Sequence, residues 1–178
     1  MADLNPTAAA ILGFLEDGEL SGYELAKAAE VFIGDFWHVT RSQVYRELAQ
    51  LAARGLVEAG EVRGRSRVPY RLTDAGRAAF AGWIAQPPPV EQIRYPLLLT
   101  IAFGSWLGPG RLTEIAAAQR PEHEQRLASY RAYQQDGGLD PYQRATVAFG
   151  IAYEEAVLHW LDELPGVLAG APHREPAG

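Results

Sequence analysis

The 178-residue sequence contains no cysteine. This absence excludes a disulfide-stapled scaffold, a zinc site built on thiolates and a cysteine nucleophile, and it is typical of a reducing compartment. The sequence also lacks an apolar run of the roughly 18 residues that a transmembrane helix needs, since its longest charge-free stretch, 95–110, is interrupted by Pro, Gly, Ser and Thr. No Lys or Arg precedes the first apolar run, which is not typical of a secretory signal. We therefore expect a cytoplasmic protein without a membrane segment.

Catalytic motifs are missing too. The sequence has no G-x-S-x-G nucleophile motif, no phosphate-binding P-loop and no G-x-G-x-x-G dinucleotide fingerprint. Four side chains have a helical spacing that suits a metal, namely Glu155, His159, Asp162 and Glu163. They include a single histidine, and a charged outer stripe explains the pattern equally well. We expect no enzyme, no metal and no cofactor, and keep a helical metalloenzyme built around His159 as an alternative that metal analysis would test.

The charges that are present are unevenly distributed. Apolar residues make up 48% of the chain and charged residues 21%, as in ordinary globular proteins. The whole chain carries −6, but the segment 36–77 holds eight arginines and four acidic residues, a local +4 that leaves −10 on the rest. A basic segment on an acidic body is expected where one face meets a polyanion such as DNA.

Capping signals divide the first half into helices. Asn5-Pro6 opens a helix that ends by Gly18, and the S-x-x-E box at Ser21 opens a second that ends by Gly34. A third helix begins at Thr40, whose box partner is Gln43, and stops at Gly55. The spacing of apolar residues in all three segments is that of amphipathic helices.

A change of period then predicts two short strands and one more helix. Residues 56–59 and 68–72 read as a β-hairpin around a charged, glycine-containing loop, and Pro69 favours an edge position. Thr73-Asp74 opens a fourth helix that runs through Ile84, and three consecutive prolines at 87–89 form a stiff linker. The order of three helices, a hairpin and a helix predicts a winged helix-turn-helix over residues 1–89.

The second half reads as helical. We expect an apolar helix over 96–107, a turn at 108–110, a charged amphipathic stretch over 111–135 with Pro121 as a kink or fresh start, and a last helix from Asp140-Pro141 to about 164. In 147–164, 12 of 18 residues are apolar and they occur all round the helix. A second copy of the chain would cover them. We therefore predict a mainly α protein with a small hairpin, a C-terminal helical dimerisation domain over 90–168 and a flexible tail over 169–178.

The third helix has the surface of a DNA-recognition helix. With Val44 at 0° and about 100° per residue, Leu48 and Leu51 lie within about 40° of it and form the core side. The opposite side is small and polar, and consists of Ser42, Arg46, Ala49 and Ala53. Such a surface fits a major groove, and the loop 63–67 adds three arginines that can contact phosphate. The predicted DNA-binding residues are Thr40, Arg41, Ser42, Gln43, Tyr45, Arg46, Arg63, Arg65, Ser66 and Arg67.

At these residues the sequence resembles the PadR family of transcriptional regulators. The resemblance rests on Gly22-Tyr23-Glu24-Leu25, on Tyr45 with Leu48 and Leu51, on Gly55-Leu56-Val57 and on Tyr70-Arg71-Leu72-Thr73-Asp74-Ala75-Gly76. The second half is similar to the C-terminal domain of AphA-type members through Arg94-Tyr95-Pro96-Leu97-Leu98-Leu99, Gly150-Ile151-Ala152-Tyr153-Glu154 and Trp160-Leu161. Position 46 is Arg, where many relatives have Pro, and the wing is short.

The resemblance implies a homodimer on a palindromic DNA operator, acting as a repressor that a small molecule releases, although AphA-like members activate. PadR relatives bind flat aromatic compounds, which makes Tyr95, Phe103, Trp106 and Trp160 the candidates for an effector site; the tryptophans equally well fill a core or a dimer seam. The alternative function is a winged-helix protein-interaction module that does not bind DNA, which the overall acidity favours slightly.

Overall fold

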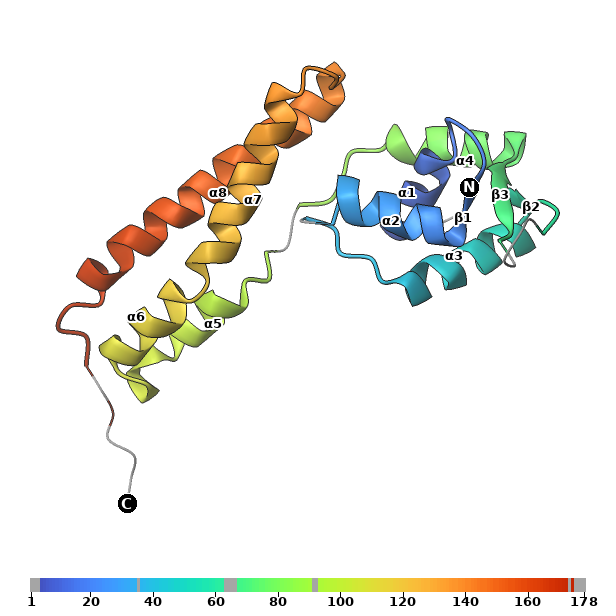
Figure 1. Cartoon of the computed structure of the whole chain (residues 1–178). Coiled ribbons are helices and arrows are strands. Elements are labelled where there is room, and N and C mark those ends of the chain that lie inside the picture. Colours follow the sequence, from blue (N-terminus) through green and yellow to red (C-terminus); the bar gives the residue numbers. More distant parts are fainter. Residues whose placement is uncertain (1–3, 35, 63–66, 91–92, 173, 175–178) are drawn as a thin grey trace. The chain divides into compact units, whose positions relative to one another are not determined.

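The computed structural model describes residues 4–34, 36–62, 67–90, 93–172 and 174 (Figure 1). The chain forms two compact units, Met1–Val90 and Glu91–Gly178. Within the described residues no helix is long and apolar enough to cross a membrane.

The helices of the first unit begin where the caps predict. Asn5 accepts a hydrogen bond from the Ala8 N–H, and both predicted capping boxes, at Ser21 and Thr40, are formed. These side chains satisfy backbone donors that the first turn of a helix leaves without partners. The helices are α1 (Pro6–Phe14), α2 (Gly22–Phe32), α3 (Arg41–Ala53) and α4 (Asp74–Ile84).

Among the described residues of this unit, the strands β1 (Leu20–Ser21), β2 (Val57–Ala59) and β3 (Pro69–Leu72) form one sheet. The predicted hairpin is β2 and β3, which pair antiparallel, but β1 pairs with the other side of β3. The expectation that Pro69 lies at an edge is therefore wrong, because β3 is the central strand. Pro69 is tolerated there since it is the first residue of the strand, and its carbonyl accepts from the Gly60 N–H at 2.8 Å. A two-residue strand such as β1 is too short to show an alternating pattern.

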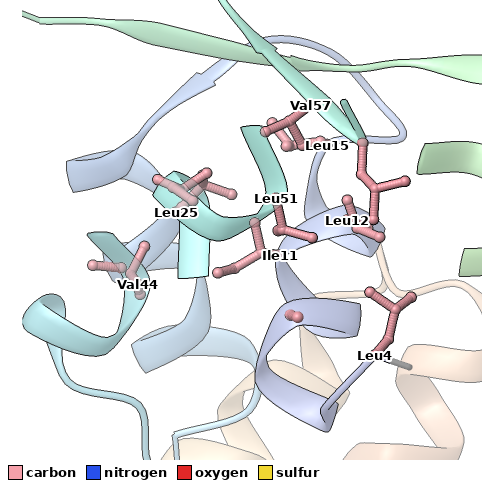
Figure 2. Close-up of a cluster of buried hydrophobic side chains, with 12 residues drawn as sticks. Leu4, Ile11, Leu12, Leu15, Leu25, Val44, Leu51 and Val57 are labelled. Carbon is pink, nitrogen blue, oxygen red and sulfur yellow. The ribbon is translucent and has the colours of Figure 1, made fainter. Parts of the chain in front are cut away.

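One hydrophobic core joins these elements. Figure 2 shows the side chains that α1, α2, α3 and β2 contribute to it. Val44 and Leu48 of α3 are fully buried, and Phe80 and Trp83 of α4 pack against the cluster from outside. Burying a side chain such as Leu48 stabilises the fold by about 1.5–3 kcal/mol, so this core fixes the orientation of α3.

The second unit is helical, as predicted, but the helix expected over 96–107 ends at Ala102 and the turn expected at 108–110 is replaced by the start of a helix. Its elements are α5 (Pro96–Ala102), a 3-10 turn η1 (Gly104–Trp106), α6 (Pro109–Ala117), α7 (Arg120–Gln135) and α8 (Pro141–Val167). Residues 108–110 do not form a free turn, because Pro109 starts α6 and Gly108 adopts φ +75° before it. Pro121 lies in the first turn of α7, so it marks a fresh start and not a kink.

The long helices α7 and α8 lie side by side (Figure 1). Gly150 permits their close approach, because a Cβ at that position would lie 2.5 Å from the Tyr130 ring. A small cluster of Leu97, Ala116, Val157, Leu161 and Leu164 joins α8 to α5 and α6. The predicted flexible tail stays a prediction, and residues 173 and 175–178 lie outside the described part. Within the tail, the Arg174 N–H donates to the Ser105 carbonyl at 2.7 Å.

Candidate nucleic-acid interface

Helix α3 presents the predicted stripe. Its inward residues Val44, Leu48 and Leu51 are buried, whereas the opposite side is exposed along the helix. That exposed side consists of Ser42, Arg46, Ala49 and Ala53. The small side chains leave the backbone close to the surface, and Arg46 is the single cation among the four. The structure therefore brings together the residues that the helical spacing predicted for a groove-facing surface.

The start of α3 is held by its own side chains. The Gln43 side-chain oxygen accepts from the Thr40 N–H at 2.8 Å and from its hydroxyl at 3.0 Å. A bidentate contact with adenine needs both the oxygen and the amide nitrogen of a glutamine. Because the oxygen of Gln43 is engaged at the cap, this residue contributes to the helix start, and Gln50 is the exposed glutamine of α3.

A buried carboxylate lies directly beside Arg46, and the sequence prediction did not include it. Glu47 is 6% exposed. One of its oxygens accepts from the Asn5 side-chain amide at 3.0 Å, and the other lies 3.7 Å from the Arg46 guanidinium. The signal was present in the helical wheel, since position 47 lies on the core side next to Leu51. Asn5 thereby links the cap of α1 to the residue that neighbours the exposed arginine.

Tyr45 extends the surface toward α2. A Cβ on Gly22 would lie 2.5 Å from the nearest atom of the Tyr45 ring. Only glycine at residue 22 therefore allows this contact without a shift. Nearby, the Arg41 guanidinium lies 5.0 Å from the centre of the Tyr23 ring. A cation over an aromatic face is attracted by the ring quadrupole, which keeps Arg41 on this side of the unit.

The loop between β2 and β3 is described only in part. The predicted contacts Arg63, Arg65 and Ser66 lie outside the described residues, so they stay predictions. Arg67 is exposed and borders an open hollow between α2, α3 and β3. Arg71, by contrast, pairs with Glu58 across the sheet, and this hydrogen bond raises the pKa of the Arg71 guanidinium.

The candidate effector residues divide into two pairs. Tyr95 and Trp160 lie together, with 6.1 Å between their ring centres. Phe103 and Trp106 are 63% and 60% exposed on the segment between α5 and α6. Arg174 lies 5.4 Å from the centre of the Trp106 ring. Within the described part of the chain no ring contact joins the two pairs, so the structure does not gather all four residues in one place.

Next to Tyr95 the second unit contains a buried polar network that the prediction missed. His123 and Glu154 are 3% and 2% exposed, and Nδ1 of His123 lies 2.5 Å from the Glu154 carboxylate. The other ring nitrogen lies 3.2 Å from the Tyr95 hydroxyl, and Nε of Arg126 lies 3.2 Å from Glu154. Burial raises the pKa of Tyr95, which favours its neutral form. Among the described residues no group of three or more His, Cys, Asp or Glu side chains could hold a metal ion.

Comparisons with known proteins agree with this arrangement. Residues 11–82 match the model of the transcriptional regulator PadR-like family, and residues 93–169 match the virulence activator alpha C-terminal model. The chain is 32% identical over 180 residues to the probable transcriptional regulator Rv1176c of Mycobacterium tuberculosis. The matched region covers 89% of this chain and 95% of that protein. The chain is also 29% identical over 123 residues to the negative transcriptional regulator PadR of Bacillus subtilis, covering 67% and 68% of the two chains.

Solved structures have the same fold. The structure of Bacillus subtilis PadR in complex with operator DNA gives a TM-score of 0.80 at 23% identity and covers 92% of this chain and 99% of that one. The complex of the same protein with p-coumaric acid gives 0.72 at 24% identity, covering 91% and 98%. The virulence activator AphA of Vibrio cholerae gives 0.70 at 26% identity, covering 92% and 98%.

Proposed function

Since the chain belongs to the PadR-like family of transcriptional regulators, with a C-terminal domain of the virulence-activator type, we propose that it regulates transcription by binding double-stranded DNA sequence-specifically as a homodimer. The observation that carries the proposal is the exposed stripe of α3, where Arg46 is the one cation among small side chains. Three small residues let a helix lie deep in the major groove, and an arginine there reads guanine or holds a phosphate.

In this proposal residues 1–89 form the DNA-binding domain. Arg46 contacts a base edge, and Thr40, Arg41 and Ser42 lie at the start of α3, where the helix dipole favours a phosphate. Gln43 maintains that helix start through its bond to Thr40. Tyr45 and Arg67 contact the backbone, and Arg63, Arg65 and Ser66 of the wing extend these contacts along it.

Residues 90–168 form the dimerisation domain in this proposal. Helix α8 buries Val157 and Leu161 within the unit but exposes Phe149, which is stacked on Tyr153 with 6.3 Å between ring centres. On α5, Leu98 and Leu99 are exposed as well. Large apolar side chains grouped on a helix face are typical of a protein interface. A twofold dimer would place two α3 helices about 34 Å apart in successive major grooves of a palindromic operator.

The proposals for the sign of regulation and for the effector are supported by one relative of the same family. The relative from Bacillus subtilis is a negative regulator whose complex with p-coumaric acid has been solved. We propose that this chain is likewise a repressor and that a small aromatic compound releases it. Tyr95 and Trp160, whose rings lie together beside the buried His123, are the residues best placed to contact that compound. We assign no catalytic role to any residue and place the protein in the cytoplasm with its DNA.

Electrophoretic mobility shift with the DNA upstream of its own gene tests this function. We expect the wild-type protein to bind this duplex more tightly than a random duplex of equal length, with an affinity that falls steeply with salt, because each neutralised phosphate contributes about 0.9 to the slope of log K against log salt.

Arg46→Ala should reduce the discrimination between the two duplexes, whereas Arg144→Ala on α8 serves as the matched control. If the wild-type protein binds neither duplex, the alternative of a protein-interaction module is favoured. If Arg46→Ala keeps full discrimination, Arg46 does not read a base.

A further inference from the structure

A hollow of about 340 Å³ opens between the start of α2, the first turns of α3 and the start of β3. Three tyrosines line it, Tyr23 from α2, Tyr45 from α3 and Tyr70 from β3. Arg67, just before β3, completes the wall. The four side chains are distant in sequence, so only the folded unit brings them together. We call this feature the tyrosine cradle.

The phenol hydroxyls of the three cradle tyrosines are available as hydrogen-bond donors. Within the described residues, none of the three phenol hydroxyls makes a hydrogen bond to another protein group. Tyr23 and Tyr45 are 45% and 51% exposed, so large parts of their surfaces remain accessible. A phenol hydroxyl is a good donor to an anionic oxygen, and several donors converging from different sides favour a compact anion.

The charges around the cradle are of the sign that an anion needs. Arg67 borders the hollow, and Arg41 is held over the outer ring by its contact with Tyr23 at 5.0 Å. Glu24 is the nearby acid, but its carboxylate already accepts from the Ser21 N–H at 2.8 Å and from the Ser21 hydroxyl at 2.6 Å. These two bonds, together with the charge of nearby Arg67, lower the pKa of Glu24.

The position of Tyr45 in the cradle depends on a single glycine. A Cβ at Gly22 would meet two atoms of the Tyr45 ring at 2.5 and 2.9 Å. The absence of a side chain at residue 22 therefore lets this ring, which comes from the recognition helix, close one side of the hollow. The same helix carries Arg46 on its exposed stripe, so α3 contributes both the Tyr45 side of the cradle and the proposed base-reading surface.

We propose that the tyrosine cradle holds one phosphate of the DNA backbone beside the major groove that α3 enters. The inference rests on the proposed DNA-binding function and adds Tyr23 and Tyr70 to its contacts. A phosphate is present at every nucleotide, so the cradle fixes the position of α3 on the duplex without selecting a sequence. Hydroxyl donors serve this purpose well, because they add affinity to any phosphate that geometry brings within reach.

Tyrosine-to-phenylalanine variants of the full chain test the proposal, because they keep the ring and remove only the hydroxyl. The variants are Tyr23→Phe, Tyr45→Phe and Tyr70→Phe, and the matched control is Tyr142→Phe on α8, where the side chain is 85% exposed. Affinity is measured over a salt series for the upstream duplex and for a random duplex. We expect each cradle variant to lose roughly tenfold in affinity for both duplexes alike, because a hydrogen bond to a charged group is lost.

Arg67→Ala provides an electrostatic signature that the phenylalanine variants lack. It should lower the slope of log K against log salt by about 0.9, because one phosphate charge is no longer neutralised, whereas the tyrosine variants should leave the slope unchanged. Gly22→Ala, which displaces the Tyr45 ring, should weaken binding to both duplexes as Tyr45→Phe does. Thermal melting of each variant establishes that it is folded under the conditions of the binding assay.

Inorganic phosphate separates the DNA backbone from a free anion as the occupant. If phosphate alone raises the melting temperature of the wild-type protein but not of Tyr23→Phe, and DNA affinity is unchanged in that variant, the cradle is a free-anion site and the proposal is wrong. It is also wrong if the variants bind both duplexes like wild type, or lose only discrimination between them. A wild-type protein that binds neither duplex contradicts the DNA-binding function itself, and this is seen before any variant is made.

Discussion

His123 on α7 and Glu154 on α8 face each other in the interior of the second unit, with 2.5 Å between Nδ1 of the imidazole and the carboxylate. Both residues are almost fully buried. A buried carboxylate is costly unless polar partners compensate it, and here His123 lies within hydrogen-bond distance and Arg126 forms an ion pair with it. The network therefore joins α7 to α8 in one defined register, next to the aromatic pair Tyr95 and Trp160.

Removing the Glu154 carboxylate should destabilise the protein strongly. Glu154→Ala leaves His123 and Arg126 without their common partner, and breaking a buried pair in this way costs about 3–5 kcal/mol of unfolding free energy. The control is Glu155→Ala, because Glu155 pairs with Arg131 at 2.7 Å but is exposed, and such a pair contributes about 1 kcal/mol or less. Urea unfolding followed by tryptophan fluorescence measures both. Equal losses in the two variants would show that burial does not make the Glu154 pair special.

Stability at high pH should depend on Tyr95. Burial raises the pKa of its phenol above the ordinary value of 10.0. Above that value the unfolded chain releases the proton while the folded chain still binds it, so the free energy of unfolding falls as pH rises, until the folded group also ionises. Tyr95→Phe should make this fall less steep, and Tyr142→Phe, at an exposed position, should not change it. Unfolding curves between pH 9 and pH 11 provide the measurement; identical slopes for wild type and Tyr95→Phe contradict the expectation.

The exposed stack on α8 should control oligomeric state. Phe149→Glu places a charge where the proposed interface needs an apolar side chain, so sedimentation velocity should show a shift from dimer to monomer. Val62→Glu, at an exposed apolar position of the first unit, is the control and should leave the dimer intact. A Phe149→Glu protein that sediments as a dimer at the same concentration as wild type would place the interface elsewhere.

Two glycines of α4 should respond in opposite directions to the same change. A Cβ on Gly76 would lie 2.0 Å from the Leu56 carbonyl oxygen, so Gly76→Ala should destabilise the protein by about 1–3 kcal/mol through overpacking. At Gly82 the space is open, and Gly82→Ala should stabilise the protein by about 0.5–1 kcal/mol, because alanine restricts the unfolded chain and favours helix. Thermal unfolding of the two variants gives the comparison, and a destabilised Gly82→Ala would contradict it.

Local signals in the sequence predicted the elements of the first unit well. The boxes at Ser21 and Thr40 determine where α2 and α3 begin, because the bonds that form them lie within four consecutive residues. The stripe of Arg46 could be predicted for the same reason, since residue spacing alone places it opposite Val44 and Leu48. Its contacts with DNA stay predictions, as does the effector role of Trp160.

By itself, the sequence determined the order of α1 to α4 and of the β2–β3 hairpin, the beginnings of the capped helices and the side of α3 that carries Arg46. These properties depend on side chains a few residues apart, whose relative positions any helix imposes. Only the tertiary structure placed β3 between two strands, buried Glu47 beside Asn5, assembled Tyr23, Tyr45 and Tyr70 round one hollow and set His123 against Glu154. Each of these depends on how elements distant in the chain pack against one another, and local periodicity carries no information about such contacts.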